Sequence, residues 1–291
     1  MSDAGTLVGV AGWIYDDWKD VVYPTSEKDK LAWLAQYLDC VEINSSFYHP
    51  FSESVAQKWL KSVESNPRFQ FTGKAWQRFT HETDKPYSEA DVRNCLAGFQ
   101  ALADGGRFAA LLFQFPFYFE DGVANRDLLK RLADDFGAFR RVVEVRHTSW
   151  AEPGALAFIE SLGYSVACLD MPLSRTSFRE DALVTGGLGY LRLHGRNYKA
   201  WFSKEADRDE KYNYLYTDED LDGVLERIRR LREAADSVVV IWNNHYRGKA
   251  AVNAFQTLSS LKGERVDVPA PLQAAYPQLR EAAKREKGLL F

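Results

Sequence analysis

Several features that mark common classes of protein are missing from this chain of 291 residues. Its three cysteines, Cys40, Cys95 and Cys168, lie far apart and form no CxxC pair, which argues against a zinc knuckle or a disulfide framework. Isolated cysteines suit a reducing compartment, so we expect a cytoplasmic protein. No apolar run approaches the roughly 18 residues of a membrane span, and the first residues do not resemble a signal peptide. We therefore expect no membrane association.

The chain also lacks an excess of positive charge. Lys and Arg number 37 against 41 Asp and Glu, and the net charge is −4 at pH 7. No global basic field is available to hold a nucleic-acid backbone, so nucleic acid is disfavoured as a partner. The segment GVAGW at 9–13 lacks the GxGxxG spacing of a dinucleotide-binding loop. We expect no cofactor.

Short apolar runs alternate with segments of helical apolar spacing. The runs, which we predict to be strands, begin at residues 7, 40, 69, 108, 141, 165, 189 and 237. Helical spacing is found at 28–38, 53–63, 97–103, 127–136, 153–163 and 219–235. Eight strand–helix units over roughly 250 residues predict a (β/α)8 barrel, an α/β fold, in preference to an open doubly wound sheet.

Two parts of the chain depart from this regular pattern. Residues 171–188 show no helical spacing, so the sixth unit is expected to be irregular. Residues from about 262 onward are charged and contain proline. Because no Pro-, Gly- or Ser-rich linker divides the chain, we expect one barrel domain over 1–291 with this tail packed outside it.

Polar residues lie inside or at the end of the predicted strands, where a parallel barrel normally carries apolar side chains. With two-residue alternation, Glu42 and Asn44 share one strand face, and Glu144 and Arg146 share another. Catalytic groups of such barrels gather at the carboxyl ends of the strands. The other polar residues at these ends are Lys74, Gln114, Asp170, Arg192, His194, Arg196, Asn243 and Asn244.

Histidines and tryptophans follow the same distribution. His49, His81, His147, His194 and His245 all lie at or just after a predicted strand end, and so do Trp13 and five other tryptophans. Aromatic walls with a few convergent polar groups are typical of a ligand pocket. Each residue alone is also compatible with a structural role; Glu42, for example, is compatible with half of a buried ion pair.

Eight motifs together resemble the YecE-like family, number 72 among the domains of unknown function. They are GVAGWIYDDWKDVVYP, VEINSSFYHP, FTGKAWQRFTHE, LLFQFP, VEVRHTSW, LDMP, YLRLHGR with YNYLYTDEDL, and IWNNHYRGKAAVNA. The resemblance runs in order from about residue 7 to 258 and implies a (β/α)8 barrel without an established activity. One departure is local: the family's usual Lys-Ala-Pro-Arg is Lys74-Ala75-Trp76-Gln77 here, which puts any shared substrate preference at this loop in doubt.

The leading hypothesis is an enzyme that acts on a small anionic substrate without a metal. The charges at the strand ends are four positive (Lys74, Arg146, Arg192, Arg196) against three negative (Glu42, Glu144, Asp170). Because arginine presents a bidentate fork to phosphate or carboxylate, this balance suits a substrate such as an anionic sugar derivative. The reaction class, hydrolase, lyase or isomerase, is left open, as is the oligomeric state.

Roles are assigned as follows. Glu42 and Glu144 are the expected acid and base, because neighbouring carboxylates in different surroundings differ in proton affinity. Lys74, which we expect to face Glu42, is either an electrostatic clamp or, where arginines lower its pKa, a Schiff-base nucleophile. Substrate binding is assigned to Trp13, Asn44, Tyr48, Gln114, Arg146, His147, Arg192, His194, Arg196, Asn243, Asn244 and His245.

Two alternatives remain open. A metal-dependent hydrolase or isomerase would use Glu42, Glu144, Asp170 and His194 as ligands, although the basic residues would repel a cation. A binding module without catalysis would use the basic and aromatic residues of the last two loops, among them Arg196, Lys199, Trp201 and Arg247. Residues 197–217 form a long loop that is either a lid or a surface excursion.

Overall fold

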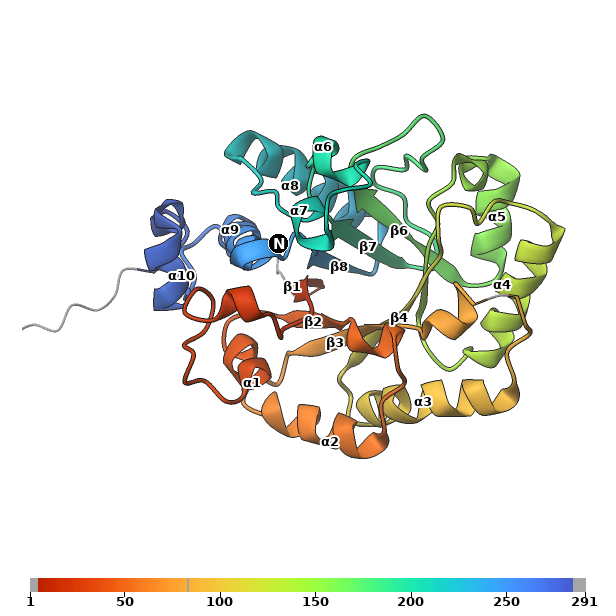
Figure 1. The fold of residues 1–291 in the computed structure, drawn as a ribbon, viewed down its shortest axis with the longest axis horizontal. Coiled ribbons are helices and arrows are strands. Elements are labelled where there is room, and N and C mark those ends of the chain that lie inside the picture. Colours follow the sequence, from red (N-terminus) through yellow and green to blue (C-terminus); the bar gives the residue numbers. More distant parts are fainter. Residues whose placement is uncertain (1–4, 83, 285–291) are drawn as a thin grey trace, which may run out of the picture.

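The computed structural model describes residues 5–82 and 84–284, which form a closed barrel of parallel strands (Figure 1). Each strand pairs with the next along the chain, and the eighth pairs with the first. The strands are β1 Thr6–Ala11, β2 Cys40–Ile43, β3 Gln70–Lys74, β4 Phe108–Gln114, β5 Arg141–Glu144, β6 Tyr164–Asp170, β7 Leu188–Leu193 and β8 Ser237–Trp242. The predicted (β/α)8 barrel and all its predicted strands are confirmed.

Helices surround the barrel and connect most successive strands. The α-helices are α1 Lys30–Ala35, α2 Glu53–Ser62, α3 Glu89–Asp104, α4 Val123–Asp135, α5 Pro153–Ser161, α6 Tyr198–Trp201, α7 Arg208–Lys211, α8 Asp218–Ala234, α9 Lys249–Lys262 and α10 Ala270–Ala275. Short 3-10 helices are η1 Asp16–Trp18, η2 Ser45–Phe47, η3 Gln77–Phe79, η4 Thr148–Ala151, η5 Tyr246–Gly248 and η6 Pro277–Arg280. In the described ranges, none of these helices has the length and apolarity needed to cross a membrane.

The short helices α6, α7 and α10 were not predicted, and the two largest differences among the longer helices are at α3 and α9. α3 begins at Glu89, well before the predicted start at 97, because Ser88 and Asp91 form a capping box. α9 has no predicted counterpart: Ala250 to Ala254 are buried in succession, so the helix lacks the one-sided spacing that reveals a surface helix. Between β6 and β7 the described chain contains no helix, which confirms the irregular sixth unit.

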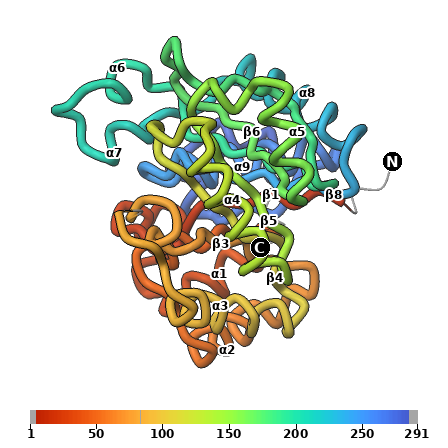
Figure 2. The backbone as a smooth tube through the Cα atoms, turned by 90° about the vertical axis from the view of Figure 1, so that its right-hand side faces the viewer, coloured from red at the N-terminus to blue at the C-terminus, as the bar shows by residue number. Residues whose placement is uncertain are grey.

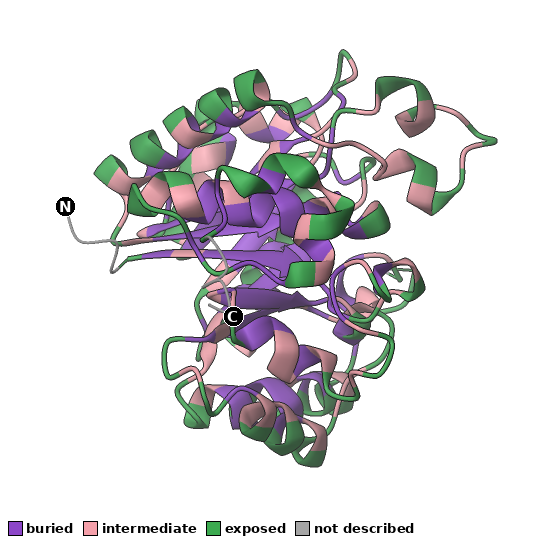
Figure 3. Cartoon of the chain, turned by 90° about the vertical axis from the view of Figure 1, so that its left-hand side faces the viewer, coloured by how far each residue is buried: buried purple, intermediate pink, exposed green. Residues whose placement is uncertain are grey.

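Strand side chains alternate between the barrel interior and the surrounding helices. Val41 and Ile43 belong to the large core between strands and helices, whereas Cys40 belongs to the small apolar cluster inside the barrel. Glu42, two residues after Cys40, therefore points into the barrel and is fully buried. Figure 3 shows the strands as a buried layer beneath the half-exposed helices.

The described part of the C-terminal tail lies outside the barrel. After α9 the chain forms α10 and η6, and the side chains of Leu272 and Leu279 are fully buried there. Figure 1 places α10 beside α9, away from the centre of the barrel. The division into one domain with an outer tail stays a prediction, and residues 285–291 of that tail lie outside the described ranges.

The interior of the barrel is tightly packed where β1 meets β2. A Cβ atom added at Gly9 would lie 1.9 Å from the carbonyl oxygen of Cys40, and a backbone atom has little freedom to move away. We expect Gly9→Ala to lower the free energy of unfolding by about 3 kcal/mol, measured by urea unfolding. Gly223→Ala is the control: this glycine lies within α8 with open space around it, and we expect a gain of about 0.5–1 kcal/mol. Equal unfolding midpoints for Gly9→Ala and the parent would contradict the close contact.

Candidate functional site

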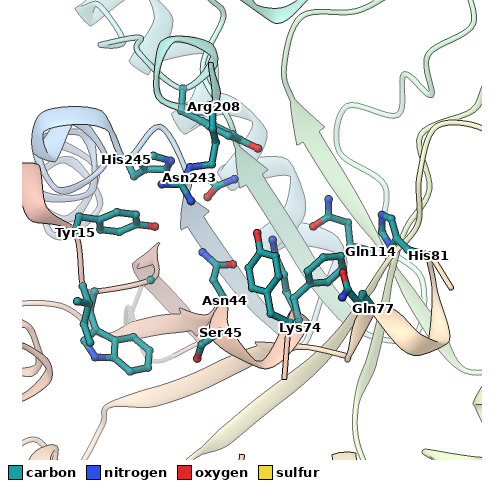
Figure 4. Close-up of a pocket in the computed structure, with 16 residues that line it drawn as sticks. Tyr15, Asn44, Ser45, Lys74, Gln77, His81, Gln114, Arg208, Asn243 and His245 are labelled. Atoms are coloured by element: carbon teal, nitrogen blue, oxygen red, sulfur yellow. The ribbon is translucent and has the colours of Figure 1, made fainter. Parts of the chain in front are cut away.

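Loops that follow the strands enclose a cavity of about 450 Å³ at the carboxyl end of the barrel (Figure 4). This volume falls within the range of small-molecule sites. The cavity, called the mouth cavity below, is lined by Gly12, Trp13, Ile14, Tyr15, Asn44, Ser45, Phe47, Tyr48, Lys74, Gln77, His81, Gln114, Arg208, Tyr212, Asn243 and His245. It lies at the face where barrels of this kind carry their active sites.

The charged side chains of the lining are both positive. Lys74 ends β3, and Arg208 comes from the loop after β7. No carboxylate is found among the sixteen lining residues. Amide, imidazole and phenol groups supply the rest of the polar surface, so the cavity combines hydrogen-bonding groups with an excess of positive charge.

Lys74 lies in an environment that disfavours its protonated form. Its Nζ atom is 5.8 Å from the centre of the Phe47 ring and forms no ion pair with any carboxylate of the described residues. Burial, followed by the nearby charge of Arg192, lowers the pKa of Lys74 to about 8, against the opposing attraction of Glu42 and Glu144. A larger share of neutral amine is therefore present at neutral pH than in an exposed lysine, whose pKa is about 10.4.

Beneath the mouth cavity lies an ionic cluster of Glu42, Glu144, Arg146 and Arg192, called the Arg192 cluster below. The Arg192 guanidinium donates to both carboxylate oxygens of Glu42, at 3.1 and 2.6 Å, and also to Glu144. Arg146 donates to the other oxygen of Glu144 at 3.0 and 2.7 Å. Glu42, Glu144 and Arg192 are fully buried, so the cluster ties β2, β5 and β7 together across the barrel interior.

Within the Arg192 cluster, Glu144 and Arg192 are held in the ionised state by the charges around them. Burial alone would raise the pKa of Glu144, but the guanidinium groups of Arg192 and Arg146 outweigh burial and keep this pKa far below its usual value. Burial acts to lower the pKa of Arg192, and the charges of Glu144 and Glu42 reverse this and raise it. Glu42 also accepts a 3.0 Å hydrogen bond from the Tyr190 hydroxyl.

This geometry corrects three expectations: the partner of Glu42, the place of the two glutamates at the site, and the role of Arg192. Glu42 forms its ion pair with Arg192 rather than with Lys74, because Arg192 reaches across the barrel from β7. Glu144 is likewise held by arginines. Neither carboxylate lines the mouth cavity, so both stand below the place where a substrate would bind. Arg192, expected to bind the substrate anion, is fully buried and has its guanidinium occupied by these two carboxylates.

His194 and Asn243 connect the Arg192 cluster to the mouth cavity. Nδ1 of His194 lies 2.9 Å from Nδ2 of Asn243, and Asn243 lines the cavity while His194 does not. Burial and the charge of Arg192 lower the pKa of His194 well below its usual value, so its imidazole is neutral. His194 is thus a supporting group for Asn243.

Three other predicted residues point away from the mouth cavity. Arg196 is paired with Asp170 at 2.7 Å and with Asp220 at 2.6 Å, outside the barrel interior. Asn244 donates to the carbonyl of Tyr214 and to the side chain of Asn253. His147 caps η4, with Nδ1 2.9 Å from the Ser149 hydroxyl. The positions of Arg196, Asn244 and His147 therefore do not support the substrate-binding role predicted for them.

The alternative metal ligands are not brought together. Asp170 faces α8 and is bound by Arg196, Arg227 and the Tyr216 hydroxyl, because Leu169 takes the inward position on β6. Glu42 and Glu144 are occupied by arginines. No group of three or more His, Cys, Asp and Glu side chains suitable for a metal ion occurs within 5–82 and 84–284.

Two residues of the cavity lining, Asn44 and His245, have a polar atom without a partner. Oδ1 of Asn44 and Nδ1 of His245 are buried and have no hydrogen-bond partner. His245 stacks on Tyr15 with ring centres 4.6 Å apart and packs against Tyr212 at 5.1 Å. Burial and the charge of Arg208 lower the pKa of His245 to about 4, so this imidazole is neutral at pH 7.

The mouth cavity therefore brings together Trp13, Asn44, Tyr48, Lys74, Gln114, Asn243 and His245 of the predicted residues. It also contains residues that the sequence prediction did not assign to the site: Gly12, Ile14, Tyr15, Ser45, Phe47, Gln77, His81, Arg208 and Tyr212. The sequence contained signals for three of these: His81 lies just after a predicted strand end, and Arg208 and Tyr212 belong to the long loop at 197–217. The assignments of catalytic and binding roles stay predictions.

A closed eight-stranded parallel barrel with a polar cavity at the carboxyl ends of its strands defines a (β/α)8-barrel protein. Comparison with known families goes further. The chain belongs to the family described as protein of unknown function DUF72, whose model matches residues 7–278. The resemblance drawn from the motifs is confirmed.

Individual relatives agree with this assignment. A curated relative from Bacillus subtilis (strain 168), the UPF0759 protein YunF, is 27% identical over 276 residues, which cover 87% of this chain and 94% of the relative. The crystal structure of a DUF72 family protein from Thermotoga maritima MSB8 is 30% identical with a TM-score of 0.77, covering 89% of this chain and 99% of that chain. A DUF72 family protein from Enterococcus faecalis V583, 22% identical over 90% of this chain and 97% of that chain, also has a TM-score of 0.77. None of these descriptions names an activity.

The Arg192 cluster predicts a large effect of removing its central cation. Arg192→Met leaves Glu42 and Glu144 buried without their shared partner, and we expect a loss of about 3–5 kcal/mol in the free energy of unfolding, measured with urea. Arg146→Gln is the matched control, because Arg146 is partly exposed and Glu144 keeps Arg192; here we expect about 1 kcal/mol. A loss below 1 kcal/mol for Arg192→Met would show that the cluster does not stabilise the barrel.

Proposed function

We propose that this chain is an enzyme that binds a small anionic carbonyl compound in the mouth cavity and forms an imine with it through Lys74. The observation that carries the proposal is the unpaired Lys74 amine on the cavity wall, with its pKa lowered to about 8. A neutral amine at a desolvated site is a nucleophile for carbonyl carbon. The cationic lining favours a substrate with a phosphate or carboxylate.

The charge balance below the cavity explains why Lys74 is poised in this way. The Arg192 cluster contains two carboxylates and two guanidinium groups, so its net charge is zero. Protonated Lys74 therefore adds a positive charge beside a cluster of zero net charge, in which Glu42 and Glu144 attract it while Arg192 and Arg146 repel it. Glu42 and Glu144 act in this proposal through Arg192, as fixed charges, rather than as the acid and base of the sequence hypothesis.

The chemistry balances with groups in the cavity. Neutral Nζ of Lys74 adds to the carbonyl carbon; the carbonyl oxygen takes up protons and leaves as water, and nitrogen loses its protons as the C=N bond forms. His81 lines the cavity, and burial together with the charges of Arg146 and Lys74 lowers its pKa, so its neutral imidazole is available to accept a proton. The imine withdraws electrons from the adjacent carbon, which suits lyase or isomerase chemistry.

The imine predicts covalent trapping at one lysine. Incubation with pyruvate or glyceraldehyde 3-phosphate and cyanoborohydride reduces any imine to a stable secondary amine, and peptide mass spectrometry locates it. We expect modification at Lys74 in preference to other lysines, and its loss in Lys74→Met. Lys249→Met is the control: the pKa of Lys249 is also lowered by burial, but this residue does not line the mouth cavity. Modification spread evenly over the exposed lysines, with none concentrated at Lys74, would rule the proposal out.

The lowered pKa predicts the pH dependence of trapping. Because only the neutral amine attacks, the initial rate at Lys74 should rise with pH and level off above a midpoint of about 8. An exposed lysine should show its midpoint near 10.4 instead. We compare the two by measuring the rates of modification of Lys74 and of the exposed lysines in the same samples, between about pH 6 and 10. A midpoint for Lys74 equal to that of exposed lysines would contradict the assigned environment.

A further inference from the structure

The long loop after β7 carries an arginine to the mouth cavity that no motif or predicted role includes. The loop contains α6 and α7, and Figure 2 shows it standing out from the rest of the chain. Arg208 is the first residue of α7 and lines the cavity. In Figure 4 Arg208 enters from the loop on one side of the cavity, while Lys74 rises from β3 on the other.

The guanidinium of Arg208 is not committed to a structural role. Its ion pair is with the adjacent Asp209 at 3.3 Å, and both side chains are largely exposed. An exposed pair between neighbouring residues contributes little energy, so an anion in the cavity competes with it readily. Arg208 thus differs from Arg192 and Arg196, whose guanidinium groups are held by carboxylates.

The base of the loop is anchored, which fixes where Arg208 can reach. Tyr212 packs on His245 and lies 5.6 Å from the Trp201 ring centre. Asn197 donates to the carbonyls of Glu210 and Asn213. The loop therefore holds Arg208 over the cavity wall formed by Tyr15, Asn44 and His245.

We propose that Arg208 binds the oxyanion of the substrate held at Lys74 and selects anionic over uncharged carbonyl compounds. The inference rests on the proposed function and deepens it. On the lining of the same cavity, Oδ1 of Asn44 and Nδ1 of the 4%-exposed His245 lack partners. Such atoms suit hydroxyl groups of a ligand. The substrate class is thus a small hydroxylated carbonyl compound with its oxyanion at the end remote from the imine.

A pair of probes isolates the contribution of Arg208. Glyceraldehyde and glyceraldehyde 3-phosphate differ in the phosphate alone, and their trapping rates at Lys74 are compared in the parent chain, Arg208→Gln and Lys204→Gln. Lys204 is an exposed cation of the same loop that does not line the cavity. We expect the parent and Lys204→Gln to favour the phosphate ester by about tenfold or more. In Arg208→Gln the ratio of the two rates should fall close to one.

Pyruvate in parallel assays distinguishes a carboxylate from a phosphate as the preferred oxyanion: a larger effect of Arg208→Gln on pyruvate assigns the carboxylate. Preservation of the parent ratio in Arg208→Gln would overturn the role of Arg208 while leaving imine formation intact. The opposite outcome, in which Arg208 binds an anion but no imine forms, is tested with Lys74→Met, because this variant cannot form the imine. Thermal stabilisation of Lys74→Met by inorganic phosphate, lost in Lys74→Met with Arg208→Gln, would support the anion site even where trapping fails.

Discussion

The burial of Arg192 between two carboxylates is the interaction on which the rest of the site depends. A guanidinium inside a closed barrel is stable only with full compensation, and Glu42 and Glu144 provide it from two other strands. The same contacts fix β2, β5 and β7 relative to one another. They also place a rigid, electrically neutral floor under the mouth cavity, so that groups above the floor are governed by burial and by charges that do not move.

Lys74 illustrates the consequence of this floor. A lysine that faced Glu42 directly, as the sequence led us to expect of Lys74, would be held protonated by the ion pair. Because Arg192 takes both carboxylates, Lys74 is left near charges of both signs without a partner of its own. Burial is the largest cause of its lowered pKa and the charge of Arg192 adds to it, so changes in Arg192 and Lys74 should be coupled.

Local patterns in the sequence were sufficient for the barrel and for part of the site. Two-residue alternation placed Glu42 inside, and the strand ends led to Lys74, Gln114 and Asn243. Ion-pair partners were not accessible in this way, because contacts across a barrel depend on strand order and stagger. β6 shows a related difficulty: both of its faces are apolar, so alternation alone did not reveal that Asp170 points outward. Arg208 and Tyr212 were missed because loop conformations follow no period.

The origin of the lining residues divides the mouth cavity into a fixed and an adaptable part. Lys74 and Gln114 stand on strands whose positions are set by barrel closure and by the Arg192 cluster. Arg208 stands on a projecting loop anchored through Tyr212. Under the proposed function, a change in the loop would alter which anion is bound without disturbing the amine, whereas a change in the floor would alter the amine for every substrate. The proposal therefore assigns reactivity to the barrel and selectivity to the loop.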